Sequence, residues 1–179
     1  MNFKDTTFVG IAGGTCSGKS FLSNLLLKHY GKDLISIIKL DSYYIDLSHL
    51  SMEERNKNNF DHPDSFDFDL LYEDLLKLNQ TKSINIPVYD YKTHTRTNKV
   101  LEIKKNKIII IEGILSLFHE KIRDLMSIKC FIDIPSNERK IMRLKRDVDN
   151  RARTKESILL QYSTSIEPMY IKYIEKTKK

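Results

Sequence analysis

Residues 13–20 of this chain read GGTCSGKS, a stretch that satisfies the pattern G-x-x-x-x-G-K-[S/T]. A chain of this length contains the pattern by chance in roughly 1 % of cases. Four of the six glycines in the sequence lie within nine positions here, which indicates a loop whose backbone approaches a ligand closely. In such loops the backbone N–H groups and the start of the following helix bind phosphate oxygens. The stretch predicts a nucleoside triphosphate site formed by Gly13, Gly14, Thr15, Cys16, Ser17, Gly18, Lys19 and Ser20.

The flanking sequence supplies the strand and the helix that this loop requires. Thr6–Ala12 is a short β-rich run, and Lys19–Tyr30 is amphipathic and ends near Gly31. Strands that alternate with helices along the rest of the chain predict an α/β fold of the P-loop NTPase type, with a parallel sheet flanked by helices. The further strands are expected at 34–40, 107–111 and 128–134, and the further helices at 65–78, 136–149 and 155–176.

Residues 83–105 follow a different pattern, in which polar and apolar residues alternate around Pro87. This pattern predicts a β-ribbon at an edge, inserted into the α/β fold. No linker rich in glycine, serine or proline divides the 179 residues, so we expect a single domain over residues 1–179.

Composition argues against a membrane or secreted protein. The longest apolar run, Ile108–Ile111, is far shorter than the ~20 residues that span a bilayer. Asp5 stands where a signal peptide has its apolar core, and Cys16 and Cys130 are too few for a disulfide scaffold or a cysteine-rich zinc site. A cytoplasmic protein without a membrane partner is expected.

The net charge of +6 is unevenly distributed along the sequence. Residues 137–155 hold eight basic and three acidic side chains, whereas residues 41–76 hold ten acidic and two basic ones. A nucleic-acid surface is more uniformly basic, so we do not expect a nucleic-acid partner. The asymmetry is typical of a cleft in which cations bind an anionic ligand and carboxylates perform chemistry or hold a metal.

Two carboxylates are expected to face the phosphate loop. Asp41 and Glu112 each end a predicted strand, at the edge where open α/β sheets bind ligands. Asp41 could accept a proton from an acceptor hydroxyl, and Glu112 could hold Mg²⁺ through water. Lys19 would reach the β- and γ-phosphates, and the Ser20 hydroxyl would bind Mg²⁺. A helix cap for Asp41 and a turn residue for Glu112 are the structural alternatives.

Two other classes of nucleotide-binding protein fit the sequence poorly. A GTPase usually carries N-K-x-D, but residues 56–59 and 98–101 both lack the aspartate, and no D-x-x-G is present. An ATP-driven motor would end its Walker-B strand in Asp-Glu, whereas the strand at 108–112 ends in a single glutamate. A small-molecule kinase is therefore favoured.

Several further blocks, in this order along the chain, resemble the uridine kinase (uridine–cytidine kinase) family of P-loop kinases from about residue 8 to about residue 177. They are DSYY at 41–44, NFDHPDSFD at 59–67, PVYDYKTHTR at 87–96, EGIL at 112–115, RD at 146–147, RAR at 151–153 and QY at 161–162. The blocks at 59–67 and 89–96 are the specific ones, because many enzymes share the phosphate loop.

The resemblance implies transfer of a phosphoryl group from ATP or GTP, with Mg²⁺, to the 5′-hydroxyl of uridine and cytidine in pyrimidine salvage. It also implies a homotetramer. Asp41 would be the base, assisted by Lys19 and Arg146, and Asp61 would bind the ribose hydroxyls. The nucleoside site would comprise Tyr44, Asp61, Tyr89, Tyr91, His94, Arg96, Ile114, Arg143, Arg153 and Gln161. The phosphates would be bound by Arg143, Arg146, Arg151 and Arg153, within a lid at 143–155, and Mg²⁺ by Ser20, Asp41 and Glu112.

The sequence departs from the family pattern at two places. Ala152 replaces the glycine of the usual Arg-Gly-Arg lid, which costs on the order of 1 kcal/mol if that position needs a positive φ. The family continues with a further strand and helix, and without them we expect an open sheet edge or reliance on a partner subunit. A related kinase with another acceptor, or a catalytically weak nucleotide-binding protein, are the alternatives.

Overall fold

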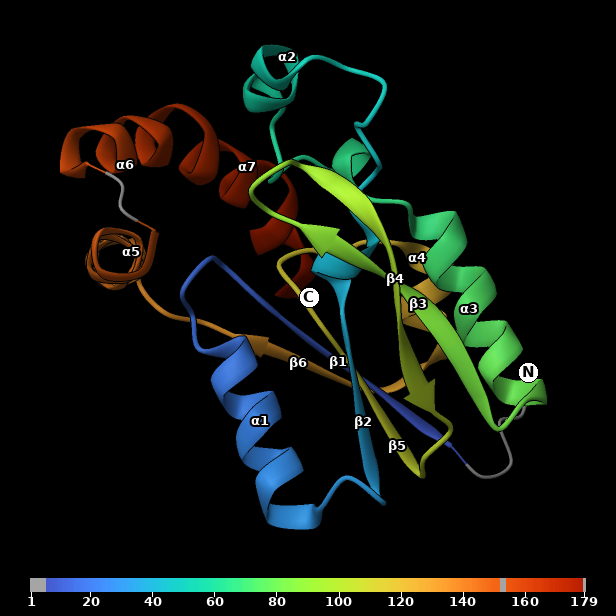
Figure 1. Cartoon of the computed structure of the whole chain (residues 1–179). Helices are drawn as coiled ribbons and strands as arrows, with labels where there is room; N and C mark the ends of the chain where they lie inside the picture. The colour runs from blue at the N-terminus through green and yellow to red at the C-terminus, as the bar shows by residue number, and fades with distance from the viewer. Residues whose placement is uncertain (1–5, 152–153, 179) are drawn as a thin grey trace.

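The computed structural model describes residues 6–151 and 154–178, and it confirms the predicted P-loop α/β fold (Figure 1). Four parallel strands form the central sheet in the order β2-β5-β1-β6. Their bounds are β1 Thr7–Gly13, β2 Ile35–Lys39, β5 Ile108–Glu112 and β6 Met126–Ile132. Because the strands are parallel, the loop after β1, the carboxylate of Asp41 just after β2 and that of Glu112 at the end of β5 meet at one edge of the sheet.

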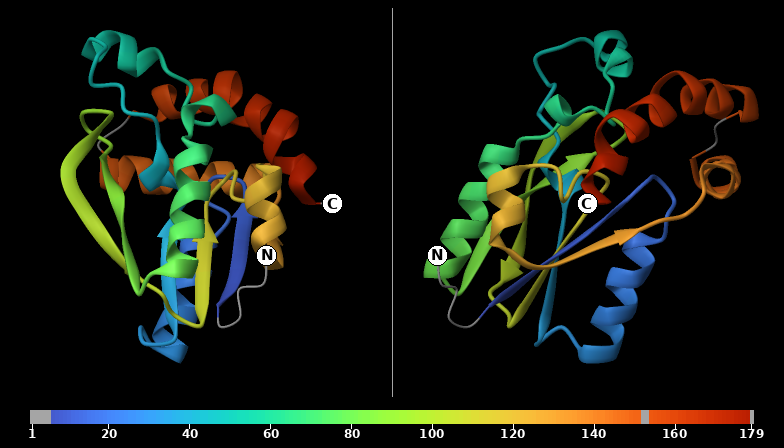
Figure 2. Two further views of the ribbon diagram at one scale, coloured as in Figure 1. Left: turned by 90° about the vertical axis from the view of Figure 1, so that its right-hand side faces the viewer. Right: turned by 180° about the vertical axis from the view of Figure 1, so that it is seen from behind.

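Helices cover both faces of the sheet, and this explains the isoleucine-rich strands (Figure 2). Ile109, Ile110 and Ile111 of β5 are fully buried, since alternate side chains point to opposite faces. On one face Ile110 packs with α1 (Lys19–Tyr30). On the other face Ile109 and Ile111 belong to a larger core. That core includes residues of α3 (Phe68–Gln80), α4 (Glu120–Leu125) and the helical segment at residues 155–178, which we call the C-terminal helix.

The predicted β-ribbon is an antiparallel hairpin of β3 (Ser83–Asp90) and β4 (Thr95–Lys104). Its strands form a separate two-stranded sheet that packs on α3 (Figure 1). The turn contains His94 at φ 55, and the tip of the hairpin lies at the same edge as the phosphate loop. The hairpin thus places its tyrosines above the carboxyl ends of the central strands.

Three helical segments differ from the predictions. The helix expected at 65–78 begins at Phe68 instead, because Asp67 caps it by accepting a hydrogen bond from the N–H of Leu70 at 3.0 Å. α4 and the six-residue helix α2 (Met52–Lys57) were not expected. The sequence carried a signal for α2, since Ser51 and Glu54 form a capping box.

The chain ends in α5 (Ser136–Arg151) and a second helical segment over residues 155–178. That second segment is not uniformly α-helical. It runs through α6 (Lys155–Gln161), a π-turn at Tyr162–Ile166, α7 (Glu167–Met169), a second π-turn at Tyr170–Ile174 and a final 3₁₀ turn. Pro168 lacks the N–H of an α-helical bond, and the Thr164 hydroxyl bonds the carbonyl of Leu160, so both residues favour a local departure from α geometry. In the described part of the chain, no helix has the length and apolarity needed to cross a bilayer.

Candidate active site

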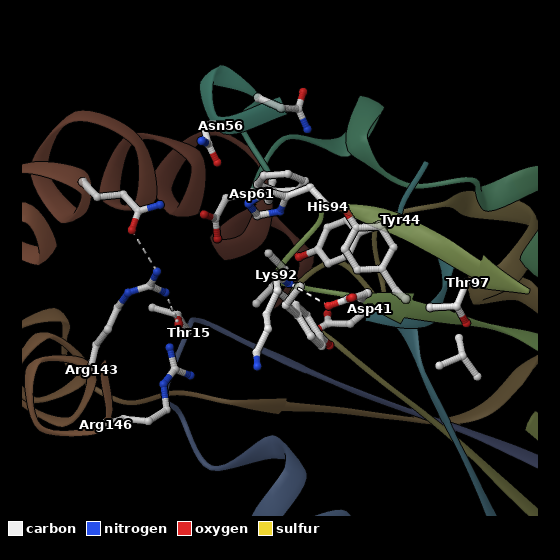
Figure 3. A pocket seen from close by; sticks show the side chains of 18 of the residues that line it. Thr15, Asp41, Tyr44, Asn56, Asp61, Lys92, His94, Thr97, Arg143 and Arg146 are labelled. Atoms are coloured by element: carbon white, nitrogen blue, oxygen red, sulfur yellow. Dashed lines mark hydrogen bonds between the residues drawn. The ribbon is translucent and has the colours of Figure 1, made fainter. Parts of the chain in front are cut away.

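A cavity of about 1250 Å³ opens at the carboxyl edge of the sheet, between the phosphate loop, the hairpin and α5 (Figure 3). One end is formed by Thr15 of the phosphate loop and by two arginines of α5. The other end is formed by aromatic residues from the hairpin and from the loop after β2. The residues that line the cavity include Thr15, Asp41, Tyr44, Phe60, Asp61, Tyr89, Tyr91, His94, Ile114, Arg143, Arg146 and Gln161.

The phosphate loop has the geometry that its sequence predicts. Gly18 adopts φ 92 immediately before α1, a conformation that favours glycine, and the helix therefore begins at Lys19. The Lys19 ammonium donates to the carbonyls of Gly13 and Gly14 at 2.9 and 2.7 Å. Burial lowers the pKa of Lys19 to about 8, although Glu112 and Asp41 nearby oppose the shift. The loop thus holds a cation that is poorly solvated and available to phosphate.

Ser20 and Glu112 form the polar pair expected of a Mg²⁺ site. The Ser20 hydroxyl donates to Oε1 of Glu112 at 2.7 Å, and burial raises the pKa of that carboxyl. Asp41 is close enough to raise the same pKa further. A hydroxyl and two carboxylates are hard oxygen ligands, and Mg²⁺ is usually held by one or two carboxylates together with substrate phosphates and water. The residues present therefore fit Mg²⁺.

Asp41 lies in a 3₁₀ turn, Leu40–Tyr43, directly after β2. The residue before that turn, Lys39, occupies its N-cap position, so Asp41 is not the cap that the alternative interpretation required. Oδ2 of Asp41 accepts a hydrogen bond from the Tyr91 hydroxyl at 3.1 Å (Figure 3). A hydroxyl group therefore already lies within bonding distance of this carboxylate, on the side that faces the cavity.

Aromatic rings form the wall opposite the phosphate loop. Tyr44 is buried, and its ring stacks on Phe66 with a centroid distance of 4.4 Å and lies 5.1 Å from the ring of Tyr89. His94 stacks on Phe60 at 4.5 Å, and burial together with the charge of Arg55 lowers its pKa. A mostly aromatic wall that also presents an imidazole suits a planar heterocycle with a polar edge.

Asp61 lies between the aromatic wall and the arginines (Figure 3). Burial raises the pKa of its carboxyl, and the nearby Arg143 guanidinium counteracts the shift. Its backbone N–H donates to Oδ1 of Asn59 at 3.2 Å, which fixes the turn that presents the carboxylate to the cavity. A half-buried carboxylate of this kind needs hydrogen-bond donors from a ligand.

The buried carboxylate of Asp147 holds Arg143 and Arg146, the two arginines of α5 that line the cavity, in place. Asp147 is fully buried, and it accepts a hydrogen bond from Nε of Arg146 at 2.7 Å and pairs with Nε of Arg143 at 3.3 Å. Arg143 also donates to Oγ1 of Thr15 at 2.8 Å and to Oε1 of Gln161 at 3.2 Å (Figure 3). Sequence reasoning gave no role to Asp147, although its spacing of four residues from Arg143 was a usable signal.

Some residues that the sequence assigned to the site do not line the cavity, and others lie outside the described residues. Arg96 is not among the residues that line the cavity: it pairs with Asp67 at 3.0 Å and donates to the carbonyl of Tyr44 at 2.9 Å, so its binding of substrate stays a prediction. Arg139, which was not assigned to the site, lies on the same helix as Arg143 and is buried beside Gly14, and a Cβ added to Gly14 would collide with its guanidinium. Arg153 and Ala152 lie outside the described residues, as does the side chain of Arg151.

Comparisons with known proteins show the family to which this chain belongs. Residues 8–179 match the model of the phosphoribulokinase / uridine kinase family. A uridine kinase from Lactococcus lactis subsp. cremoris (strain MG1363) is 43% identical over 176 residues, which cover 98% of this chain and 85% of that protein. A uridine kinase from Clostridium novyi (strain NT) is 46% identical over 171 residues, covering 96% of this chain and 82% of that protein. The solved structure of phosphoribulokinase from Rhodobacter spheroides has a TM-score of 0.68 at 11% identity and covers 98% of this chain and 67% of that chain, which supports the fold.

Proposed function

Because this chain belongs to the phosphoribulokinase / uridine kinase family of kinases, we propose that it transfers the γ-phosphoryl group of ATP or GTP to the 5′-hydroxyl of uridine and cytidine. The products are UMP and CMP, which is the chemistry of cytoplasmic pyrimidine salvage. The observation that carries the proposal is the position of Asp41, between the phosphate loop and an aromatic pocket that also contains Asp61 and His94 (Figure 3). Relatives that are named uridine kinases support it.

On this proposal the donor is bound at the phosphate loop and the arginine end of the cavity. Backbone N–H groups at the start of α1 bind the phosphates, and the Lys19 ammonium moves from the carbonyls of Gly13 and Gly14 to the β- and γ-phosphates. Arg143 and Arg146 neutralise the charge that develops on the transferred group. Mg²⁺, held by Ser20, Asp41 and Glu112, would offset phosphate charge when bound.

The acceptor lies against the aromatic wall. Tyr44, Tyr89 and Tyr91 pack against the pyrimidine, and His94 hydrogen-bonds its polar edge. Asp61 accepts hydrogen bonds from the ribose hydroxyls, so a missing 2′-hydroxyl leaves a carboxylate oxygen unpaired beneath the bound nucleoside. The 5′-hydroxyl takes the position now filled by the Tyr91 hydroxyl, beside Oδ2 of Asp41, which removes its proton.

The first experiment compares acceptors by the release of ADP from ATP and Mg²⁺. We expect turnover with uridine and cytidine, none with adenosine or a pentose phosphate, and a kcat/KM for 2′-deoxyuridine that is lower than for uridine by roughly 10²-fold or more. Turnover of the pentose phosphate instead of the nucleosides would contradict the proposal. Binding of ATP without turnover of any acceptor would contradict it as well, and would favour a nucleotide-binding protein that has lost its chemistry.

The lowered pKa of Lys19 predicts how activity depends on pH. In the free protein this ammonium loses its proton above pH about 8, so kcat/KM for ATP should fall about tenfold for each pH unit above that value. A bound triphosphate stabilises the ammonium, so kcat should stay constant to higher pH than kcat/KM does. Both parameters are measured from pH 6.5 to 10.

Unfolding does not explain this expected loss of activity, because the contribution of Lys19 to the free energy of unfolding increases with pH. Between pH about 8 and 10.5 the unfolded chain binds the Lys19 proton and the folded chain does not, so this group makes folding more favourable as pH rises. Thermal unfolding at each pH serves as the control. A value of kcat/KM that is unchanged through pH 9 would contradict the prediction.

A further inference from the structure

The C-terminal helix contacts the loop that carries Asp61 at two points, and each point falls within a π-turn. Ser165 belongs to the π-turn Tyr162–Ile166, and Tyr173 belongs to the π-turn Tyr170–Ile174. Wide turns of this kind are rare and frequently occur at functional sites. Both side chains leave the helix toward residues 59–62.

Ser165 acts on the turn before Asp61. Its hydroxyl donates to Oδ1 of Asn59 at 2.9 Å, and the same oxygen accepts the backbone N–H of Asp61 at 3.2 Å. The carbonyl of Asn59 in turn accepts the backbone N–H of His62 at 3.0 Å. Asn59 thus links the helix to the backbone on both sides of Asp61.

Tyr173 acts on the residue that follows Asp61. Its hydroxyl lies 2.8 Å from Nε2 of His62, and the two rings meet edge-on at 4.9 Å. Nδ1 of His62 accepts the N–H of Asp64 at 3.2 Å, so in neutral His62 the proton is on Nε2 and is donated to the Tyr173 oxygen. A further edge-on contact with Phe118 at 5.9 Å fixes the Tyr173 ring.

The same helix is also fixed at the phosphate end of the cavity. Gln161 accepts a hydrogen bond from Arg143, and Glu167 accepts one from the Ser136 hydroxyl at 2.6 Å. The segment 161–173 therefore spans from the arginines of α5 to the loop of Asp61, as Figure 1 shows for α6 and α7 beside α5.

We propose that Ser165 and Tyr173 are positioning residues, which hold Asp61 in place through Asn59 and His62 so that the site discriminates ribose from 2′-deoxyribose. The inference rests on the proposed function, because it takes Asp61 as the group that reads the ribose hydroxyls. It adds two residues of the C-terminal helix that do not themselves line the cavity. Their contribution depends on geometry at Asp61 and not on contact with substrate.

The test compares Ser165→Ala, Tyr173→Phe and the double variant with the wild-type protein. Each change removes one hydroxyl, and a neutral hydrogen bond of this kind corresponds to about three- to tenfold in an equilibrium or rate ratio. We expect kcat/KM for uridine to fall by that factor in each single variant, mainly through KM. The value for 2′-deoxyuridine should change little, so the ratio of the two should fall, and the Kd of ATP should stay the same.

Matched controls are available on the same chain. Thr81→Ala removes an exposed hydroxyl at the end of α3 that donates to the carbonyl of Lys77, and Tyr30→Phe removes an exposed phenol at the end of α1. Neither control should change the ratio of uridine to 2′-deoxyuridine. Hydrogen–deuterium exchange provides a readout besides activity: residues 59–66 should exchange faster in the double variant than in either control.

The outcomes separate the inference from the proposed function. If the wild-type protein does not phosphorylate uridine, both fail. If it does, an unchanged ratio in the double variant, or an equal loss for uridine and 2′-deoxyuridine, overturns the positioning role alone. A fall in the affinity for ATP as large as the fall for uridine would also overturn it, because the helix would then support the whole cavity.

Discussion

Replacing Asp41 with asparagine is expected to lower kcat with uridine by about 10²- to 10⁴-fold, the range that a positioned general base contributes. The amide has the same shape as the carboxylate but cannot accept the proton of the 5′-hydroxyl. The Tyr91 hydroxyl can still donate to the amide oxygen, so the wall of the cavity should keep its arrangement. The Kd of ATP, measured without Mg²⁺, should therefore change little, because in the proposed site Asp41 would contact the donor through the metal.

A matched control for this variant is Asp69→Asn, an exposed carboxylate in the first turn of α3, which should leave kcat unchanged. The measurement is steady-state release of ADP, together with thermal unfolding of both variants. A kcat for Asp41→Asn within about fivefold of wild type would show that another group removes the proton, and would contradict the role proposed for Asp41.

The central fold was predictable because its signals are local. The glycine-rich octapeptide after a β-rich run indicates the strand–loop–helix unit, and runs such as Ile108–Ile111 indicate buried parallel strands. The boundaries of α3 and the π-turns were less accessible. They depend on individual hydrogen bonds that compete with hydrophobic periodicity, from the N–H of Leu70 to the Asp67 carboxylate and from the Thr164 hydroxyl to the carbonyl of Leu160.

The candidate site was predictable where a residue acts through its own position at the end of a strand. Asp41 lies just after β2 and Glu112 is the last residue of β5, and the parallel sheet brings them to the same edge. Contacts that depend on tertiary structure were harder to foresee. The spacing of Asp147 from Arg143 indicates that the two could pair, but not that Asp147 is fully buried between two arginines. The ion pair of Arg96 with Asp67, 29 residues earlier in the chain, has no counterpart in the sequence pattern.

Replacing Lys19 with methionine is expected to lower kcat/KM for ATP by about 10²- to 10³-fold, the range observed when one preorganised donor to a developing charge is removed. Methionine is close to lysine in length and fills the same space. The substitution leaves the carbonyls of Gly13 and Gly14 without the ammonium, and leaves the phosphates without their cation in the loop. Lys28→Met, an exposed lysine on the same helix, is the matched control and should be without effect.

Stability should respond to Lys19→Met in the opposite direction to activity, and this distinguishes loss of function from loss of fold. Burial lowers the pKa of Lys19 from 10.5 to about 8, so the folded protein destabilises the charged form by on the order of 3 kcal/mol at neutral pH. An apolar side chain at the same place removes that penalty, although it also removes the two hydrogen bonds of the ammonium. The melting temperature should therefore equal or exceed that of the wild-type protein. A lowered melting temperature together with lost activity would show that the ammonium is needed to form the loop itself, and would contradict the view that its burial is a cost the fold bears for phosphate binding.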